Sequence, residues 1–243
     1  MTQGRSYVIN SKEKWIYNVI PKNCCSSIKL SIRDNLFKNF PESKEIKYDT
    51  DNLELVYEIT ADLHVNFEQT FAPHKIYISP ELNKSIESLN INLEEYYKFT
   101  VVRDPFARFS SFFIDKILNS KYYPRYRKLN RWLHVINSDE TDENKLLQVL
   151  IILDNESNEK REEHTKSQTW LMDLKNIKYD KILRVENINE DFESIREKYN
   201  FNPLKKMNKT FKDPKVLELL NKHKDRILSI YKDDVELLTK LKF

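Results

Sequence analysis

Apolar and polar positions along the chain predict units in which a short strand leads into a helix. Residues 15–20 (WIYNVI) form an apolar run with β-branched residues that stops at Pro21, which is typical of a buried strand closing in a loop. Ile28, Ile32 and Leu36 then recur every four residues, so we expect a helix that buries this face against the strand.

A second unit of the same kind follows near the middle of the chain. Residues 98–102 (KFTVV) read as a strand, Asp104 is a good N-cap, and Pro105 suits the first position of a helix. The apolar residues on one face of that helix are Phe106, Phe109, Phe113 and Ile117. Ser111 falls on the opposite side, near Ala107 and Arg108, so we expect it to contact something other than the core.

Further strands and helices complete an α/β pattern. Residues 75–79 and 181–185 read as strands, residues 189–199 as a helix, and residues 146–153 and the C-terminal stretch around Tyr231 as helical. This alternation predicts one domain, residues 1–243, built as a three-layer sandwich with a central, mainly parallel sheet. Ligands of such folds bind beyond the carboxyl ends of the strands.

Composition narrows the class of protein. The 243 residues are 40% hydrophobic, enough for one sizeable core, and the net charge of +3 is too balanced to favour nucleic-acid binding. Cys24 and Cys25 are adjacent, which is awkward for a disulfide and fits a reducing compartment. No signal sequence or membrane span is visible, so we expect a soluble protein.

The first loop has the character of an anion site. Residues 21–27 (PKNCCSS) connect the first strand to its helix, where backbone N–H groups and the helix dipole favour a phosphate or sulfate. Lys22 and two hydroxyls add charge and donors. With Gly4 as its only glycine, the chain cannot contain a Walker A motif, which argues against ATP hydrolysis. The alternative is an ordinary turn in which Ser26 caps the helix.

A second anion site is predicted where the second strand ends. Arg103 offers a planar fork of donors, and the Ser111 hydroxyl on the following helix can share the same phosphate. Alternatively, Arg103 pairs with a carboxylate such as Asp104, and Ser111 is a small residue at a helix contact. Two strand-end sites in one sheet suit a ligand that carries phosphates at both ends.

These two segments resemble a known family. Residues 20–27 (IPKNCCSS) and 103–113 (RDPFARFSSFF) resemble the two segments that bind 3′-phosphoadenosine 5′-phosphosulfate (PAPS) in sulfotransferases of the carbohydrate type, which include heparan 2-O- and chondroitin sulfotransferases. The resemblance implies a P-loop-like phosphosulfate-binding loop made of Lys22, Asn23, Cys24, Cys25, Ser26 and Ser27. It assigns the 3′-phosphate to Arg103 and Ser111.

The resemblance continues along the chain in the order of the family. Residues 164–168 (HTKSQ) resemble its H-x-x-x-Q stretch, residues 179–195 its strand and helix with an R-x-E core, and residues 230–238 (IYKDDVELL) its final helix. Residues 207–209 resemble its late N-[KR] loop, which adds Lys209 to the donor-binding residues. Cys24 and Cys25 stand where the family often has other small residues, so we expect no cysteine chemistry there.

The implied reaction is transfer of the PAPS sulfuryl group to an acceptor hydroxyl, with no metal. Lys22 is expected to stabilise the leaving phosphate oxygen. The general base is expected between the two PAPS segments, where His74 is favoured over His64, and Glu58 or Glu68 are further candidates. His164 is expected to shape the site or orient the acceptor.

A carbohydrate acceptor is expected from residues 120–132 (SKYYPRYRKLNRW), where basic and aromatic side chains alternate in a way that suits sugar rings and anionic groups. The same composition can bind single-stranded nucleic acid or form a solvated helix face. A nucleotide kinase or NTPase and a basic RNA-binding module are the competing functions. A cytoplasmic, bacterial enzyme acting on a saccharide or lipid-linked precursor is the simplest setting, and the oligomeric state stays open.

Overall fold

The structure is a computed structural model in which part of the chain is described. The described residues are 6–39, 76–79, 92–119, 135, 139–205 and 213–241. The chain divides into two compact units, Met1–Val102 with Lys175–Met207 and Arg103–Leu174 with Asn208–Phe243. Each unit is taken by itself below, and the prediction of a single domain stays a prediction.

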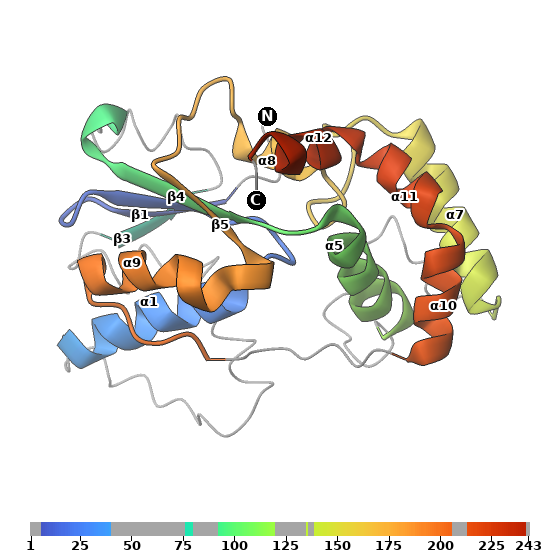
Figure 1. The fold of residues 1–243 in the computed structure, drawn as a ribbon, viewed down its shortest axis with the longest axis horizontal. Helices are drawn as coiled ribbons and strands as arrows, with labels where there is room; N and C mark the ends of the chain where they lie inside the picture. Colours follow the sequence, from blue (N-terminus) through green and yellow to red (C-terminus); the bar gives the residue numbers. More distant parts are fainter. Residues whose placement is uncertain are drawn as a thin grey trace. The chain divides into compact units, whose positions relative to one another are not determined.

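The first unit contains a five-stranded sheet in the order β3-β1-β2-β4-β5 (Figure 1). Its strands are β1 (Tyr7–Asn10), β2 (Trp15–Asn18), β3 (Ile76–Ser79), β4 (Tyr97–Val102) and β5 (Lys181–Arg184). Strands β2, β4 and β5 are parallel, whereas β1 is antiparallel to both β2 and β3. The predicted α/β class is therefore confirmed, but the sheet is mixed rather than mainly parallel.

The difference comes from β1, a strand that the sequence pattern did not predict. Asn10 ends it and caps a tight turn, since its side-chain oxygen accepts hydrogen bonds from the N–H groups of Lys12 (3.0 Å) and Glu13 (2.8 Å). Lys14 closes this turn with a φ of 52°. The apolar run before Asn10 is only three residues long, too short for a period to be read. The strands predicted near β2, β3, β4 and β5 are all present.

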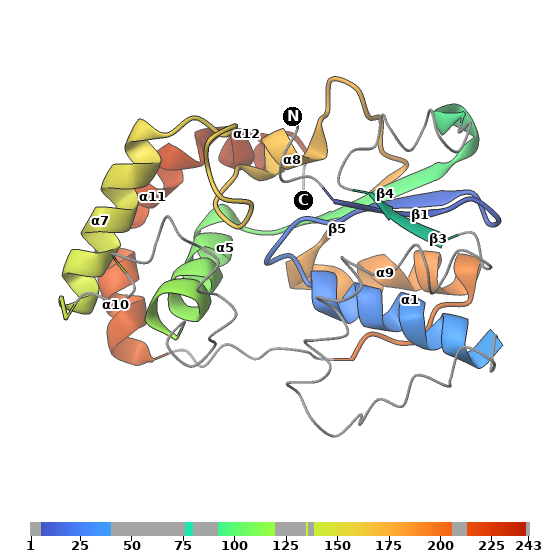
Figure 2. The ribbon, with the colours of Figure 1, turned by 180° about the vertical axis from the view of Figure 1, so that it is seen from behind.

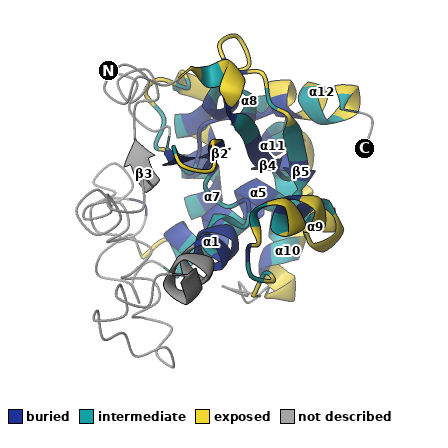
Figure 3. Ribbon diagram, turned by 90° about the vertical axis from the view of Figure 1, so that its left-hand side faces the viewer, coloured by how far each residue is buried: buried dark blue, intermediate teal, exposed yellow. Residues whose placement is uncertain are grey.

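Two helices of this unit, α1 (Cys25–Asn39) and α9 (Ile188–Tyr199), cover one face of the sheet (Figures 1 and 2). Ile28 and Ile32 of α1 are buried there with Phe192 and Ile195 of α9, whose outer face is exposed (Figure 3). The sheet residues of this core are Val8, Trp15, Tyr17, Phe99, Val101 and Leu183.

The other face of the sheet carries a smaller cluster, with Tyr7, Ile9, Ile16, Tyr96 and Ile177 at its centre. Leu93 of the short helix η3 (Leu93–Glu95) and Tyr179 pack against it. A second 3-10 helix, η7 (Val185–Asn187), links β5 to α9. In the part of this unit that is described, α-helices cover one face only, so the three-layer sandwich stays a prediction.

The second unit is helical. Its helices are α5 (Pro105–Phe112), the π-helix η4 (Phe113–Leu118), α7 (Asp142–Asn155), α8 (Gln168–Met172), α10 (Pro214–Lys222), α11 (Lys224–Ile230) and α12 (Lys232–Lys240). Asp104 caps α5 as predicted, accepting a hydrogen bond from the Ala107 N–H at 2.7 Å. The predicted apolar face is buried at Phe109, Phe113 and Ile117.

The opposite side of α5, where Ser111 was expected to contact something other than the core, also carries a buried arginine. Arg108, placed there with Ser111, is 1% exposed, and its Nη1 donates to the Lys166 carbonyl at 2.8 Å. A guanidinium can be buried in this way because it has several donors to pair. This side of α5 therefore faces a loop of the same unit at Arg108, whereas Ser111 is only half-buried.

Candidate functional site

The loop between β2 and α1 is anchored from within the first unit. Asn23 is fully buried, and its side-chain nitrogen donates to the Val101 carbonyl near the end of β4 at 2.7 Å. The Thr100 hydroxyl of β4 donates at 3.0 Å to the carbonyl of Asn18, the last residue of β2. This hydrogen bond ties the end of β2 to the neighbouring parallel strand. The loop thus lies at the carboxyl edge of the parallel strands, where ligands of α/β proteins bind.

Two residues of this loop have a left-handed backbone although neither is glycine. Lys22 has a φ of 70° and Cys24 a φ of 56°, while Asn23 between them is not left-handed. A non-glycine residue in this region costs about 1–2 kcal/mol. Backbone of alternating hand can form a concavity that favours an anion, although the Asn23 N–H already donates to the Ile20 carbonyl at 3.3 Å. The loop therefore carries local backbone strain.

Helix α1 continues the site. It begins at Cys25, one residue before the two serines, and its first turn contains no acidic residue to compete for its positive end. Ser27 is buried and Ser26 is half-buried. Cys24 and Cys25 are both free thiols. The six residues predicted to hold a phosphosulfate are thus all brought together in one strand-to-helix turn.

Arg103, at the start of the second unit, has its backbone held by one distant side chain. Its N–H donates to Gln168 Oε1 at 2.9 Å, and its carbonyl accepts from Gln168 Nε2 at 2.9 Å. Gln168 is fully buried, whereas Arg103 is half-buried, so the two hydrogen bonds are partly shielded from water. This arrangement, which we call the Gln168 clamp, fixes the backbone of Arg103.

Helix α12 in turn holds Gln168. Asp234 accepts hydrogen bonds from the N–H groups of Gln168 and Thr169, both at 2.9 Å, and from the Thr169 hydroxyl at 3.0 Å. Burial raises the pKa of Asp234, against the opposing effect of these N–H donors and of Arg108. Tyr231, just before α12, donates its hydroxyl to the Thr165 carbonyl at 3.0 Å, and burial raises its pKa to about 12.

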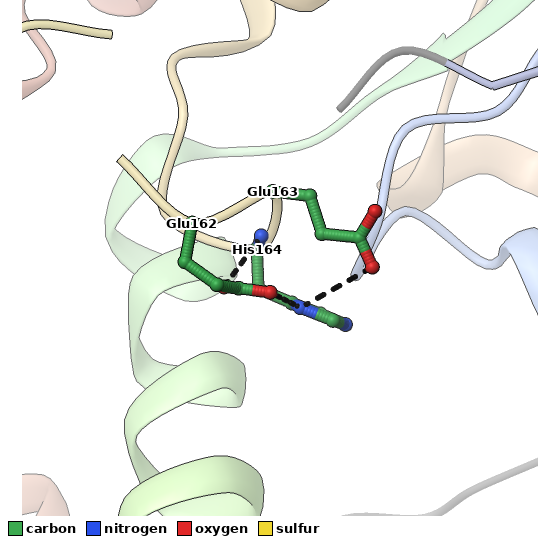
Figure 4. Close-up of side chains that lie close together, drawn as sticks. All are labelled: Glu162, Glu163 and His164. Carbon is green, nitrogen blue, oxygen red and sulfur yellow. Dashed lines mark hydrogen bonds and ion pairs between the residues drawn. The ribbon is translucent and has the colours of Figure 1, made fainter. Parts of the chain in front are cut away.

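Several predicted site residues lie outside the described residues. They are His64, His74, Lys209, Glu58, Glu68 and the segment 120–132. Ser111 lies on α5 in the same unit as Arg103. His164 is also in that unit, where Glu162, Glu163 and His164 bring potential ligand atoms within 4.8 Å of one another (Figure 4).

Gln168 and Asp234, which support the Arg103 backbone, were not predicted from the sequence. Gln168 and Asp234 both lie in segments that resemble the family, but their partners are 65 and 66 residues away along the chain. The available signal was the H-x-x-x-Q spacing together with the final helix. Nothing local indicates that Gln168 binds a backbone rather than a ligand.

In the described parts of the chain, no helix is long and apolar enough to cross a membrane. No curated protein and no solved structure gives a match to the chain. The model of the Sulfotransferase family matches residues 5–239, which includes the β2–α1 loop, Arg103, the Gln168 clamp and α12. Because that match covers nearly the whole sequence, the chain belongs to the Sulfotransferase family.

Proposed function

We propose that this transferase uses PAPS as its sulfuryl donor and a hydroxyl of a carbohydrate or glycan-containing molecule as its acceptor, by in-line transfer. The observation that carries the proposal is the β2–α1 loop of a family member, with left-handed backbone at Lys22 and Cys24 and α1 beginning directly behind it. Sulfuryl transfer needs positive charge and N–H donors where the leaving phosphate oxygen gains charge, and this loop offers both.

Within the loop, we assign each residue a role from its chemistry. Lys22 supplies the charge that stabilises the departing 5′-phosphate, and Cys24, Cys25, Ser26 and Ser27 supply N–H groups or hydroxyls. Asn23 holds the loop in place, since its side-chain nitrogen already donates to the Val101 carbonyl.

The 3′-phosphate is assigned to Arg103 and Ser111. The Gln168 clamp supports this role, because a guanidinium that binds a phosphate with two parallel hydrogen bonds benefits from a fixed backbone. Lys209 is retained as a further donor-binding residue. No metal is part of this mechanism.

His74 and His64 are retained as candidates for the base, and residues 120–132 as the acceptor-binding segment. A cytoplasmic bacterial enzyme is the setting that we expect for this reaction. Family membership favours sulfuryl transfer over a nucleotide kinase or an RNA-binding module.

Binding of adenosine 3′,5′-bisphosphate, the product that retains both phosphates of PAPS, is the first test. At 100 times the Kd, this ligand is expected to stabilise the wild type by about 2.7 kcal/mol. Lys22→Ala and Arg103→Ala should lose most of that gain, whereas Lys175→Ala, which removes an exposed lysine of the first unit, should keep it. Absence of stabilisation in the wild type would refute PAPS as the donor.

Transfer is tested with radiolabelled PAPS and a panel of glycans. Lys22→Ala is expected to abolish transfer, and unchanged transfer in a variant that still binds the bisphosphate would show that Lys22 has another role. Labelling of non-carbohydrate hydroxyl compounds alone would refute the glycan acceptor. Binding to RNA that weakens steeply with salt and ignores the bisphosphate would instead support an RNA-binding module.

A further inference from the structure

His164 is held by a carboxylate two residues before it. Glu162 Oε1 lies 2.5 Å from the imidazole Nδ1, and Glu162 Oε2 accepts the backbone N–H of His164 at 2.8 Å. Both side chains are largely shielded from water, with 19% exposure for His164 and 13% for Glu162. One carboxylate thus fixes the position of the residue and the orientation of its ring (Figure 4).

This contact determines which ring nitrogen carries the proton. An ionised carboxylate only accepts hydrogen bonds, so neutral His164 places its proton on Nδ1 and keeps the lone pair on Nε2. Figure 4 shows Nε2 at the end of the ring that points away from Glu162. None of the described residues gives Nε2 a hydrogen bond or an ion pair. The arrangement is that of a carboxylate-oriented general base.

Hydrogen bonds between residues before and after His164 hold the loop that carries it. Lys166 Nζ donates to the carbonyls of Asn158 (2.6 Å) and Glu159 (3.1 Å), and the Ser167 N–H donates to Asn158 Oδ1 at 2.7 Å. Four residues after His164, Gln168 forms the clamp on Arg103. His164 is therefore fixed relative to the residue that we assign to the 3′-phosphate.

A metal centre is the competing use of these side chains. Glu162, Glu163 and His164 are consecutive, and their ligand atoms lie within 4.8 Å of one another. Nδ1, however, is already engaged by Glu162, and Glu163 lies 3.9 Å from the same nitrogen. A metal ion at this point would have to displace the hydrogen bond that orients the ring.

The geometry points to His164 Nε2 as the atom that takes the proton from the acceptor hydroxyl, in place of His74 or His64. This inference rests on the proposed function. The acceptor oxygen forms the new bond to sulfur, the bond between sulfur and the 5′-phosphate oxygen breaks, and its electron pair stays on adenosine 3′,5′-bisphosphate. The hydroxyl proton moves to Nε2, and the Glu162 carboxylate stabilises the resulting imidazolium.

Charged and titratable groups from neighbouring elements surround this pair. Burial alone would raise the pKa of Glu162, but attraction and hydrogen bonding to His164, with a contribution from Lys116 of η4, lower it. Arg108 of α5 and Tyr231 also interact with Glu162, and Glu163 faces Nδ1. Glu162 therefore stays ionised at neutral pH and keeps Nδ1 as the donor.

The decisive variant is His164→Asn, because the asparagine amide can replace Nδ1 as the donor to Glu162 while Nε2 is lost. We expect it to keep the thermal shift produced by adenosine 3′,5′-bisphosphate but to form that product from radiolabelled PAPS about 10²- to 10⁴-fold more slowly. The assay uses the glycan panel, and water as acceptor where no glycan is labelled. His223→Asn is the matched control, since His223 is also partly buried beside a glutamate, Glu143, at 3.8 Å, and it should keep the wild-type rate.

Two readouts separate catalysis from structure. The limb of the rate–pH profile in which the rate rises with pH should disappear in His164→Asn. Nitrogen-15 spectra of labelled histidine should show neutral His164 protonated on Nδ1. An Nε2-protonated ring, or a His164→Asn variant with the wild-type rate, would overturn the inference, as would stabilisation by Zn²⁺ that requires His164. If the wild type neither binds the bisphosphate nor cleaves PAPS, the proposed function itself fails and takes this inference with it.

Discussion

Replacing Gln168 with alanine removes the clamp on Arg103 without touching the arginine side chain. The substitution leaves the Arg103 N–H and carbonyl without the two buried 2.9 Å partners that they have now. Each unsatisfied buried group costs about 1–3 kcal/mol, and partial access of water reduces the sum, so we expect a loss of about 2–4 kcal/mol in unfolding free energy.

The same change should weaken ligand binding by a separate amount. Fixing the backbone of one residue costs about 1–2 kcal/mol of free energy. In the wild type the clamp has already fixed the Arg103 backbone during folding. Without the clamp, the Arg103 backbone has to be ordered when the ligand binds, and this cost reduces the binding free energy. The Kd for adenosine 3′,5′-bisphosphate should therefore rise about 5- to 30-fold. Urea unfolding measures the first quantity, and titration calorimetry at a temperature where the variant is folded measures the second.

Thr169→Val is the matched control. The Thr169 hydroxyl donates to Asp234 at 3.0 Å and lies 3.1 Å from the Ser167 hydroxyl, and none of these hydrogen bonds involves Arg103. Valine keeps the shape, so this variant should lose about 1 kcal/mol of stability and retain the wild-type Kd. If Gln168→Ala is destabilised yet binds the bisphosphate as tightly as Thr169→Val does, the clamp serves stability alone and our reasoning about Arg103 is wrong.

Two further predictions concern other buried contacts. Asn23→Ala should lose about 1–3 kcal/mol in urea unfolding, since the Val101 carbonyl is left unsatisfied, and a loss near zero would show that the loop does not depend on that bond. Tyr231 stabilises the fold below pH 10, where its hydroxyl is neutral in both states, and this contribution falls as pH rises toward its folded pKa of about 12. Between pH 8 and pH 11, Tyr231→Phe should therefore lose about 1.4 kcal/mol less stability than the wild type, and equal losses would contradict the assignment.

The parts of the fold that the sequence predicted are those with local causes. The strand predicted at residues 15–20 is present as β2, which ends at Asn18, and α1 begins at Cys25, so the apolar run and Pro21 were enough to locate both elements to within a few residues. Asp104 and Pro105 likewise identify the start of α5 by capping chemistry alone. The anion site that we predict in the β2–α1 loop rests on this placement, because a strand-to-helix turn at that edge exposes N–H groups.

The parts that the sequence did not predict depend on partners far along the chain. Strand β1 is four residues long and becomes a strand by pairing with β2 on one side and β3 on the other. Arg108 reads as a polar residue on an outward helix face, and its burial depends on distant partners such as the Lys166 carbonyl. The left-handed backbone at Lys22 and Cys24 was not predicted, because neither residue is a glycine.

The two segments assigned to PAPS are thus supported by different physical means. Residues 22–24 are held by their own backbone conformation and by one hydrogen bond from Asn23 to β4. Arg103 depends on a relay in which Asp234 of α12 fixes Gln168, and Gln168 fixes the Arg103 backbone. We therefore expect a change at Asp234 to affect Arg103 through Gln168, although none of these hydrogen bonds joins Asp234 to Arg103 directly. The final helix, one of the segments that resemble the family, thus supports the backbone of a residue that we assign to the 3′-phosphate.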